Sequence, residues 1–173
     1  MQTKFYTGVG SRKTPESVLS LFTQWAKELN DLGYTLRSGG AAGADSAFEM
    51  GASDKRKEIY LPWRGFNGNT SVLFTVSDGA MAIARTLHPA WQSLSEGARK
   101  LMARNVYQVL GSDLKTPSEF LICYTPNGNE VGGTALAIRL ARCNDIPIFN
   151  AGCYGSGKLM CGAFREFMTG VTT

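Results

Sequence analysis

Short apolar segments alternate with helical patterns along this chain, and this alternation constrains the fold more than any other feature. Residues 4–10, 34–37, 58–61, 120–124 and 146–149 have the length and composition of strands. Helical patterns fall at 14–32, 44–51, 80–86, 95–110, 132–142 and 158–168. Strands that alternate with helices predict an α/β fold, with a doubly wound, mostly parallel sheet and helices on both of its faces.

Periodicity within individual segments supports this prediction. Apolar residues spaced by four and three positions define one face of an amphipathic helix that we expect to begin near Thr14 and Pro15: Val18, Phe22, Trp25, Leu29 and Leu32. Ser95 is the expected N-cap of a later helix. The unbroken apolar run Phe120–Tyr124 predicts a strand that is buried on both faces.

Length and composition exclude several classes of protein. With 173 residues, the chain is expected to form a single domain, 1–173. No apolar run approaches the ~20 residues of a membrane span, and no signal peptide precedes the first strand, so we expect a cytoplasmic protein. Four cysteines without CxxC spacing and a single histidine predict no metal site, and we expect no cofactor. We expect a homo-oligomer, as is common for this architecture.

Three glycine-rich loops each follow a predicted strand, and all of them should meet at the carboxyl edge of the sheet. Small residues let a backbone approach a ligand closely, and helix N-termini favour anions, so these loops predict a phosphate-binding site. The net charge of +4 suits an anionic ligand. The candidate ligand-binding residues in the loops are Gly8, Gly10, Ser11, Arg12, Ser38, Gly39, Gly40, Ala41, Gly43, Asp45, Gly132, Gly133 and Thr134.

Further candidates lie outside or beside these loops. Trp63 is placed to stack on a base or else to cover the edge of the core, and Arg104 and Asn105 either line the pocket or cap a surface. Asp45 and Glu130 are the candidate acid–base residues. The alternatives are that Asp45 complements a helix dipole and that Glu130 is a solvated loop residue.

The loop sequences resemble those of the SLOG superfamily, which includes the LOG phosphoribohydrolases and the DNA-processing protein A family. The resemblance is carried by Gly8–Arg12, by Ser38–Asp45 and by Gly132–Thr134 with the helix that follows, and it covers roughly residues 4 to 150. The segment from His88 to Asn105 is similar to a subgroup common on phages and plasmids. The resemblance implies a Rossmann-like sheet that binds nucleotides or signals derived from them.

Three functions follow as hypotheses. LOG enzymes carry a catalytic glutamate three residues after the motif threonine, but Ala135, Leu136 and Ala137 follow Thr134 here. We therefore expect binding of a nucleotide-derived small molecule, ADP-ribose-like or a cyclic nucleotide, which in a phage protein would sequester an immune signal. One alternative is a nucleotide N-glycosidase that uses Glu130 or Asp45. The other is single-stranded DNA binding, as in the DNA-processing proteins.

Overall fold

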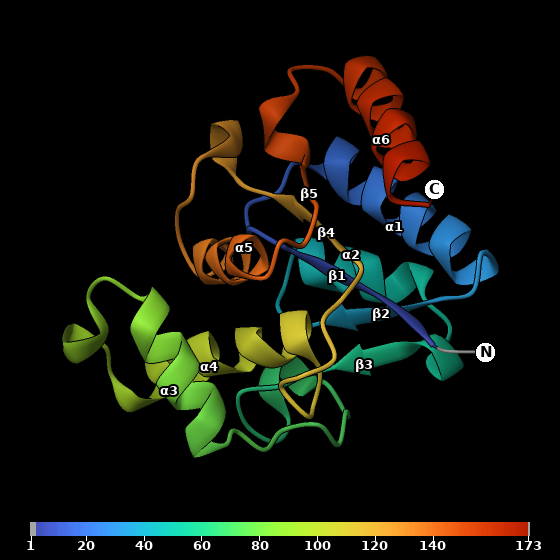
Figure 1. Ribbon diagram of the computed structural model, residues 1–173. Coiled ribbons are helices and arrows are strands. Elements are labelled where there is room, and N and C mark those ends of the chain that lie inside the picture. The colour runs from blue at the N-terminus through green and yellow to red at the C-terminus, as the bar shows by residue number, and fades with distance from the viewer. Residues whose placement is uncertain (1–2, 173) are drawn as a thin grey trace.

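The computed structural model describes residues 3–172 and confirms the predicted α/β architecture. Five parallel strands form one sheet in the order β3-β2-β1-β4-β5 (Figure 1). The strands are β1 Lys4–Gly10, β2 Tyr34–Ser38, β3 Lys57–Ile59, β4 Phe120–Tyr124 and β5 Ile148–Asn150. The helices are α1 Glu16–Asp31, α2 Ala44–Gly51, α3 Asp78–Leu87, α4 Glu96–Leu110, α5 Thr134–Cys143 and α6 Gly157–Val171.

The sheet is doubly wound, because the chain builds outward from β1 in both directions. Helices α1, α2 and α6 bury their apolar residues against one face of the sheet. Helices α4 and α5 cover the other face, and α3 packs against these two helices (Figure 1). Strand β4 shows why a continuous apolar run is needed between two such layers. Phe120 and Ile122 belong to the first core, whereas Leu121 and Cys123 belong to the second, in agreement with the prediction of a strand buried on both faces.

The C-terminal segment is an integral part of the first core. Helix α6 lies along α1, and the rings of Trp25 and Phe164 stack with their centroids 4.0 Å apart. Tyr154, just before α6, stacks on Phe149 of β5 at 5.3 Å. Gly152 is packed so closely that an added Cβ would lie 1.7 Å from the carbonyl oxygen of Thr125. The segment from Gly152 to Tyr154 is therefore packed against the carboxyl ends of β4 and β5.

The ends of some elements differ from the prediction. Thr14 does not cap α1: its hydroxyl donates to the carbonyl of Ser11 at 2.7 Å, and Pro15 occupies the N-cap position. Ser95 does cap α4, since its Oγ accepts from the N–H of Ala98 at 3.2 Å. In residues 3–172, no helix is long and apolar enough to cross a membrane.

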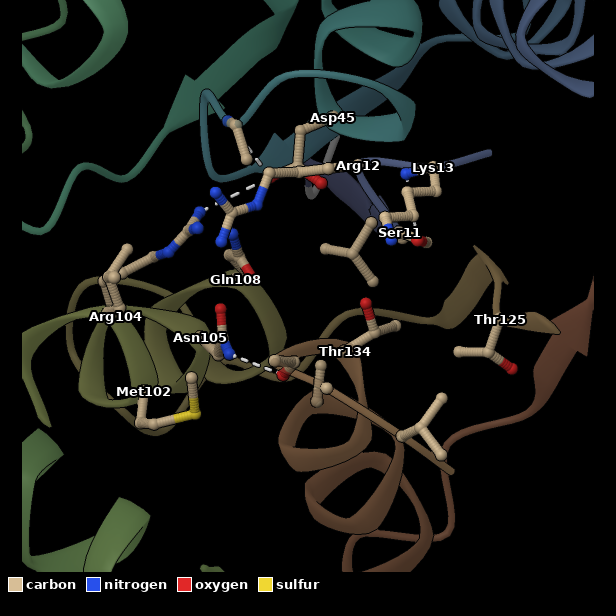
Figure 2. Close-up of a pocket in the computed structure, with 18 of the residues that line it drawn as sticks. Ser11, Arg12, Lys13, Asp45, Met102, Arg104, Asn105, Gln108, Thr125 and Thr134 are labelled. Atoms are coloured by element: carbon tan, nitrogen blue, oxygen red, sulfur yellow. Dashed lines mark hydrogen bonds and ion pairs between the residues drawn. The ribbon is translucent and has the colours of Figure 1, made fainter. Parts of the chain in front are cut away.

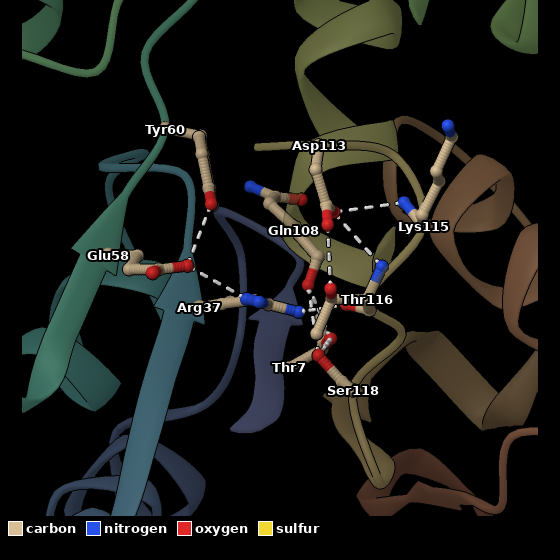
Figure 3. Close-up of polar contacts among 9 residues, drawn as sticks. All are labelled: Thr7, Arg37, Glu58, Tyr60, Gln108, Asp113, Lys115, Thr116 and Ser118. Carbon is tan, nitrogen blue, oxygen red and sulfur yellow. Dashed lines mark hydrogen bonds and ion pairs between the residues drawn. The ribbon is translucent and has the colours of Figure 1, made fainter. Parts of the chain in front are cut away.

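A buried arginine in β2 ties the sheet to the segment before β4 (Figure 3). The Nε of Arg37 donates to Glu58 on β3 at 2.8 Å, and its Nη1 donates to the carbonyl of Thr116 at 2.6 Å. The Tyr60 hydroxyl also donates to Glu58, at 2.7 Å. The Arg37 guanidinium lies 3.6 Å from the centroid of the Phe5 ring. With its charge paired in this way, Arg37 stabilises the sheet.

Candidate functional site

A cavity of about 390 Å³ opens at the carboxyl ends of β1 and β4, where the strand order reverses (Figure 2). This is the position at which doubly wound sheets bind ligands. The cavity is built from the loops after β1, β2 and β4 and from one face of α4. Among the predicted site residues, those that line it are Gly10, Ser11, Arg12, Ala41, Asp45, Arg104, Asn105, Gly132, Gly133 and Thr134.

The loop after β1 turns sharply because two other segments hold its backbone. The N–H of Ser11 donates to the carbonyl of Tyr124 at 3.0 Å, and the Ser11 carbonyl accepts from the N–H of Ala44 at 3.4 Å. A Cβ on Gly10 would lie 2.7 Å from that of Ala44, so this position needs glycine. The fixed backbone directs Arg12 and its neighbour Lys13 to the cavity, and both residues are exposed.

The loop after β2 packs directly on the first loop. Gly43 has φ of +85°, and an added Cβ would lie 2.7 Å from the Ser11 carbonyl oxygen, so glycine is required there for two reasons. Gly39 leaves room for two side chains of α4, since a Cβ there would lie 1.1 Å from Nη1 of Arg104. The glycines of this loop therefore shape the site by leaving space for the loop after β1 and for the side chains of α4.

Asp45 and Arg104 form a buried ion pair in the wall of the cavity. The carboxylate oxygen lies 3.4 Å from Nη1 of Arg104 and accepts from the N–H of Ala41 at 3.4 Å. Burial raises the pKa of Asp45, whereas Arg104 and the backbone N–H groups of Ala41 and Gly10 lower it. Asp45 thus joins the first two loops to α4.

Gln108, one turn beyond Arg104, extends this pair into a network. With its amide oxygen turned toward the donors, Gln108 accepts from Arg104 Nη1 at 2.7 Å and from the N–H of Gly39 at 2.9 Å. Its amide nitrogen then donates to Asn105 Oδ1 at 3.0 Å. Asn105 in turn donates to the carbonyl of Gly133 at 2.9 Å (Figure 2). One network therefore links all the loops of the site through α4.

Arg104 retains unused hydrogen-bonding capacity. Its Nε is buried and has no hydrogen-bond partner among the described residues. Burial lowers the pKa of Arg104, Asp45 raises it, and the nearby charge of Arg12 lowers it. The ends of the Arg12 and Arg104 side chains lie close together in Figure 2, with Asp45 as the carboxylate beside them. The charge of Arg12 is added to the Asp45–Arg104 pair, so this part of the site carries a net positive charge suited to an anion.

The loop after β4 supplies backbone donors. Gly132, Gly133 and Thr134 line the cavity at the start of α5, where the first N–H groups of a helix have no partner within the helix. These groups and the helix dipole favour an anion in the cavity.

The structure gives the remaining predicted residues other surroundings. A Cβ on Gly8 would lie 2.6 Å from the Phe48 ring in the core, and the Ser38 hydroxyl donates to the Gly8 carbonyl at 2.7 Å inside the sheet. Gly40, with φ of +64°, faces Leu61. These three residues support the site from within the fold and do not line the cavity.

Trp63 and Glu130 also lie beside the cavity and not in its wall. Trp63 is 42% exposed and packs edge-on against Phe66, whose ring lies 5.8 Å from the Arg104 guanidinium. Glu130 forms ion pairs with Arg139, at 3.6 Å, and with Arg142, both on α5. Its carboxylate thus anchors the loop after β4 to the helix that follows.

Nine lining residues were not among the predicted site residues: Val9, Lys13, Leu101, Met102, Gln108, Thr125, Pro126, Val131 and Ala137. The signal for Gln108 was present, because it lies four positions after Arg104 and therefore on the same face of a helix. Lys13 adjoins the predicted Arg12. Within residues 3–172, no group of three or more His, Cys, Asp or Glu side chains is placed to hold a metal ion.

Comparison with known proteins gives one informative similarity. No protein-family model and no curated protein matches this sequence. A solved structure of DNA processing protein A from Helicobacter pylori, described for its single-stranded DNA binding mode, superposes with a TM-score of 0.54 at 18% sequence identity. The match covers 86% of this chain and 64% of that chain, so this chain spans less than two thirds of its neighbour. The similarity establishes that the two chains share a Rossmann-like fold, as the loop motifs predicted.

Proposed function

We propose that this protein binds a nucleotide-derived small molecule in the cavity at the carboxyl ends of β1 and β4. One observation carries the proposal: Arg12 and Arg104 converge on a cavity in whose wall, among residues 3–172, Asp45 supplies the one carboxylate. An anion between the two guanidinium groups would complete the electrostatics of the site. The N–H groups at the start of α5 add donors of the kind that phosphate oxygens accept.

The size and shape of the site support a ligand larger than phosphate alone. A cavity of about 390 Å³ falls within the range of sites that enclose small organic ligands. Leu101, Met102 and Val131 provide apolar wall, and Asn105 and Thr134 provide polar groups. A nucleotide fits this arrangement if its phosphates lie beside Arg12 and its sugar lies against the polar wall. If the protein belongs to a phage, such binding would sequester the molecule from its host.

A calorimetric titration with ADP tests the proposal. We expect saturable binding to the wild-type protein and a loss of at least about tenfold in affinity for Arg12→Ala, because the variant loses a charge-assisted hydrogen bond to phosphate. Arg12 is exposed, so its removal should leave the core intact. Arg85→Ala is the matched control, since Arg85 is an exposed arginine on α3, away from the cavity. Equal binding by Arg12→Ala and the wild type, or no binding of any nucleotide, would overturn the proposal.

A second candidate function is binding of single-stranded DNA, which the structural neighbour favours. In this case the cavity would hold one nucleotide of the strand, and Trp63, exposed beside Phe66, would be available to stack on a base. A fluorescent dT oligonucleotide that binds in competition with ADP would support it. Binding that ADP does not displace would place DNA elsewhere on the surface.

Incubation of the protein with nucleotides tests whether it also hydrolyses them. Glu130 is engaged by two arginines outside the cavity wall, and Asp45 is occupied by Arg104 and by backbone N–H groups. We therefore expect ADP and AMP to be recovered intact by chromatography after incubation. Release of free adenine would make the protein an N-glycosidase and would direct attention to Asp45.

A further inference from the structure

A second cavity, of about 340 Å³, adjoins the first. Both cavities include Met102, Gly132 and Gly133 in their walls, so these residues form a partition between them. The partition is thin, because two of its three residues have no side chain. The terminal methyl of Met102 lies 3.4 Å from where a Cβ of Gly133 would be, and a methionine side chain adapts readily to a ligand.

The partition is held from both sides. On the side of the first cavity, Asn105 donates to the Gly133 carbonyl at 2.9 Å. On the other side, Glu130 ties the same loop to Arg139 and Arg142 of α5. The partition therefore has a fixed position, and a ligand that spans both cavities would cross it at the glycine backbone.

The chemistry of the second cavity differs from that of the first. Its acidic and basic side chains are Glu130 and Arg139, and these pair with each other at 3.6 Å. Nη1 of Arg139 also donates to the Leu87 carbonyl at 3.2 Å. Such a site offers no unpaired positive charge to a phosphate. The first cavity, in contrast, has Arg12 and Lys13 exposed at its wall.

The rest of the second cavity suits a flat, uncharged ring. Pro89, Ala135 and Leu136 give it an apolar surface. His88 adds a polar edge: its Nδ1 accepts from the N–H of Ala90 at 3.2 Å, so Nε2 is the ring nitrogen that this bond leaves available. Apolar walls with a few placed polar groups are typical of sites that bind nucleobases.

We propose that the second cavity binds the second base of a ligand made of two nucleoside units joined through phosphate. The phosphates would lie in the first cavity, and the chain would cross Gly132–Gly133. This inference rests on the proposed function, because it assigns phosphate to the first cavity. Two sources share this chemistry, a free dinucleotide and two successive nucleotides of a single strand.

The test compares AMP with the linear dinucleotide pApA by calorimetry. We expect pApA to bind the wild-type protein about tenfold more tightly than AMP, the scale of one additional base contact. In His88→Trp, where the indole would fill the second cavity, this advantage should disappear while AMP affinity stays unchanged. Thr86→Trp is the control, because Thr86 is exposed two residues earlier and should retain the advantage.

The outcomes separate this inference from the function on which it rests. If AMP binds but pApA binds no better, or if His88→Trp keeps the pApA advantage, the second cavity is not a base site. Absence of binding by AMP, ADP and pApA would instead overturn the proposed function itself. A 20-nucleotide strand that binds much more tightly than d(pApA), with the same His88→Trp sensitivity, would identify single-stranded DNA as the source. Equal affinities would identify the free dinucleotide.

Discussion

Asp45 is buried where the loops after β1 and β2 meet α4, and its carboxylate is the partner of the buried Arg104 guanidinium. We predict that Asp45→Asn destabilises the protein by about 3–5 kcal/mol, because it leaves a buried positive charge without its anion. Urea unfolding measures this change. The double variant Asp45→Asn/Arg104→Met should recover part of the lost stability, since it removes the unpaired charge. A change of less than about 0.5 kcal/mol in the single variant would contradict this account of the pair.

At the scale of single residues, the sequence predicted which loops form the site better than it predicted whether each residue lines the cavity or supports the fold. Arg12, Asp45 and Arg104 lie at the cavity, as predicted. Gly8 supports the fold, because the Phe48 ring, forty positions away in the sequence, occupies the space that a side chain at position 8 would need. A glycine beside a ligand and a glycine beside a distant aromatic ring look the same in one sequence. Only the packing distinguishes them.

At the scale of elements, the contact between α4 and the loop after β2 depends on the absence of a Cβ at Gly39. We predict that Gly39→Ala displaces Arg104 and Gln108, lowers the free energy of unfolding by about 1–3 kcal/mol and weakens ADP binding. Both displaced side chains are buried in one network, so they cannot simply move into solvent. Gly155→Ala is the control, with open space at its Cβ position. If Gly39→Ala behaved like this control, the network would not position the site.

The packing of α6 on α1 gives a second prediction at this scale. Phe164 is 5% exposed and stacks on Trp25, so Phe164→Ala should destabilise the protein by about 3–5 kcal/mol in chemical denaturation. Leu159 lies on the same helix but is 65% exposed, and Leu159→Ala should change stability by less than about 0.5 kcal/mol. Similar effects of the two substitutions would mean that α6 does not pack as described.

The order and type of the elements could be predicted because hydrophobic periodicity reports burial directly. Their ends were less predictable. Thr14 has the residue type of an N-cap, but the Ser11 carbonyl, placed by the turn before it, accepts its hydroxyl instead. Likewise β5 is Ile148–Asn150 and not 146–149, because pairing with β4 begins at Ile148. Such shifts are set by neighbouring segments and not by the local sequence.

At the scale of the whole molecule, the charge distribution predicts a weak dependence of DNA binding on salt. Two exposed cations, Arg12 and Lys13, lie at the main cavity, and each phosphate neutralised on a single strand releases about 0.7 counterions. We therefore predict a slope of about −1 to −2 in a plot of log affinity for dT oligonucleotides against log salt. A slope steeper than about −4 would require a basic groove well beyond the cavity and would contradict a site confined to it.

The central claim is that the phosphate of a nucleotide binds beside Arg12 in the cavity at the carboxyl ends of β1 and β4, and nuclear magnetic resonance of ¹⁵N-labelled protein titrated with ADP tests it most directly. The account predicts saturable shifts of the backbone amide signals of Ser11, Arg12, Gly133 and Thr134, and of the Arg104 Nε–H signal. Signals from Gly155 and Leu159, away from the cavity, should stay in place. Shifts confined to other parts of the molecule, or no shifts at saturating ADP, would contradict the claim.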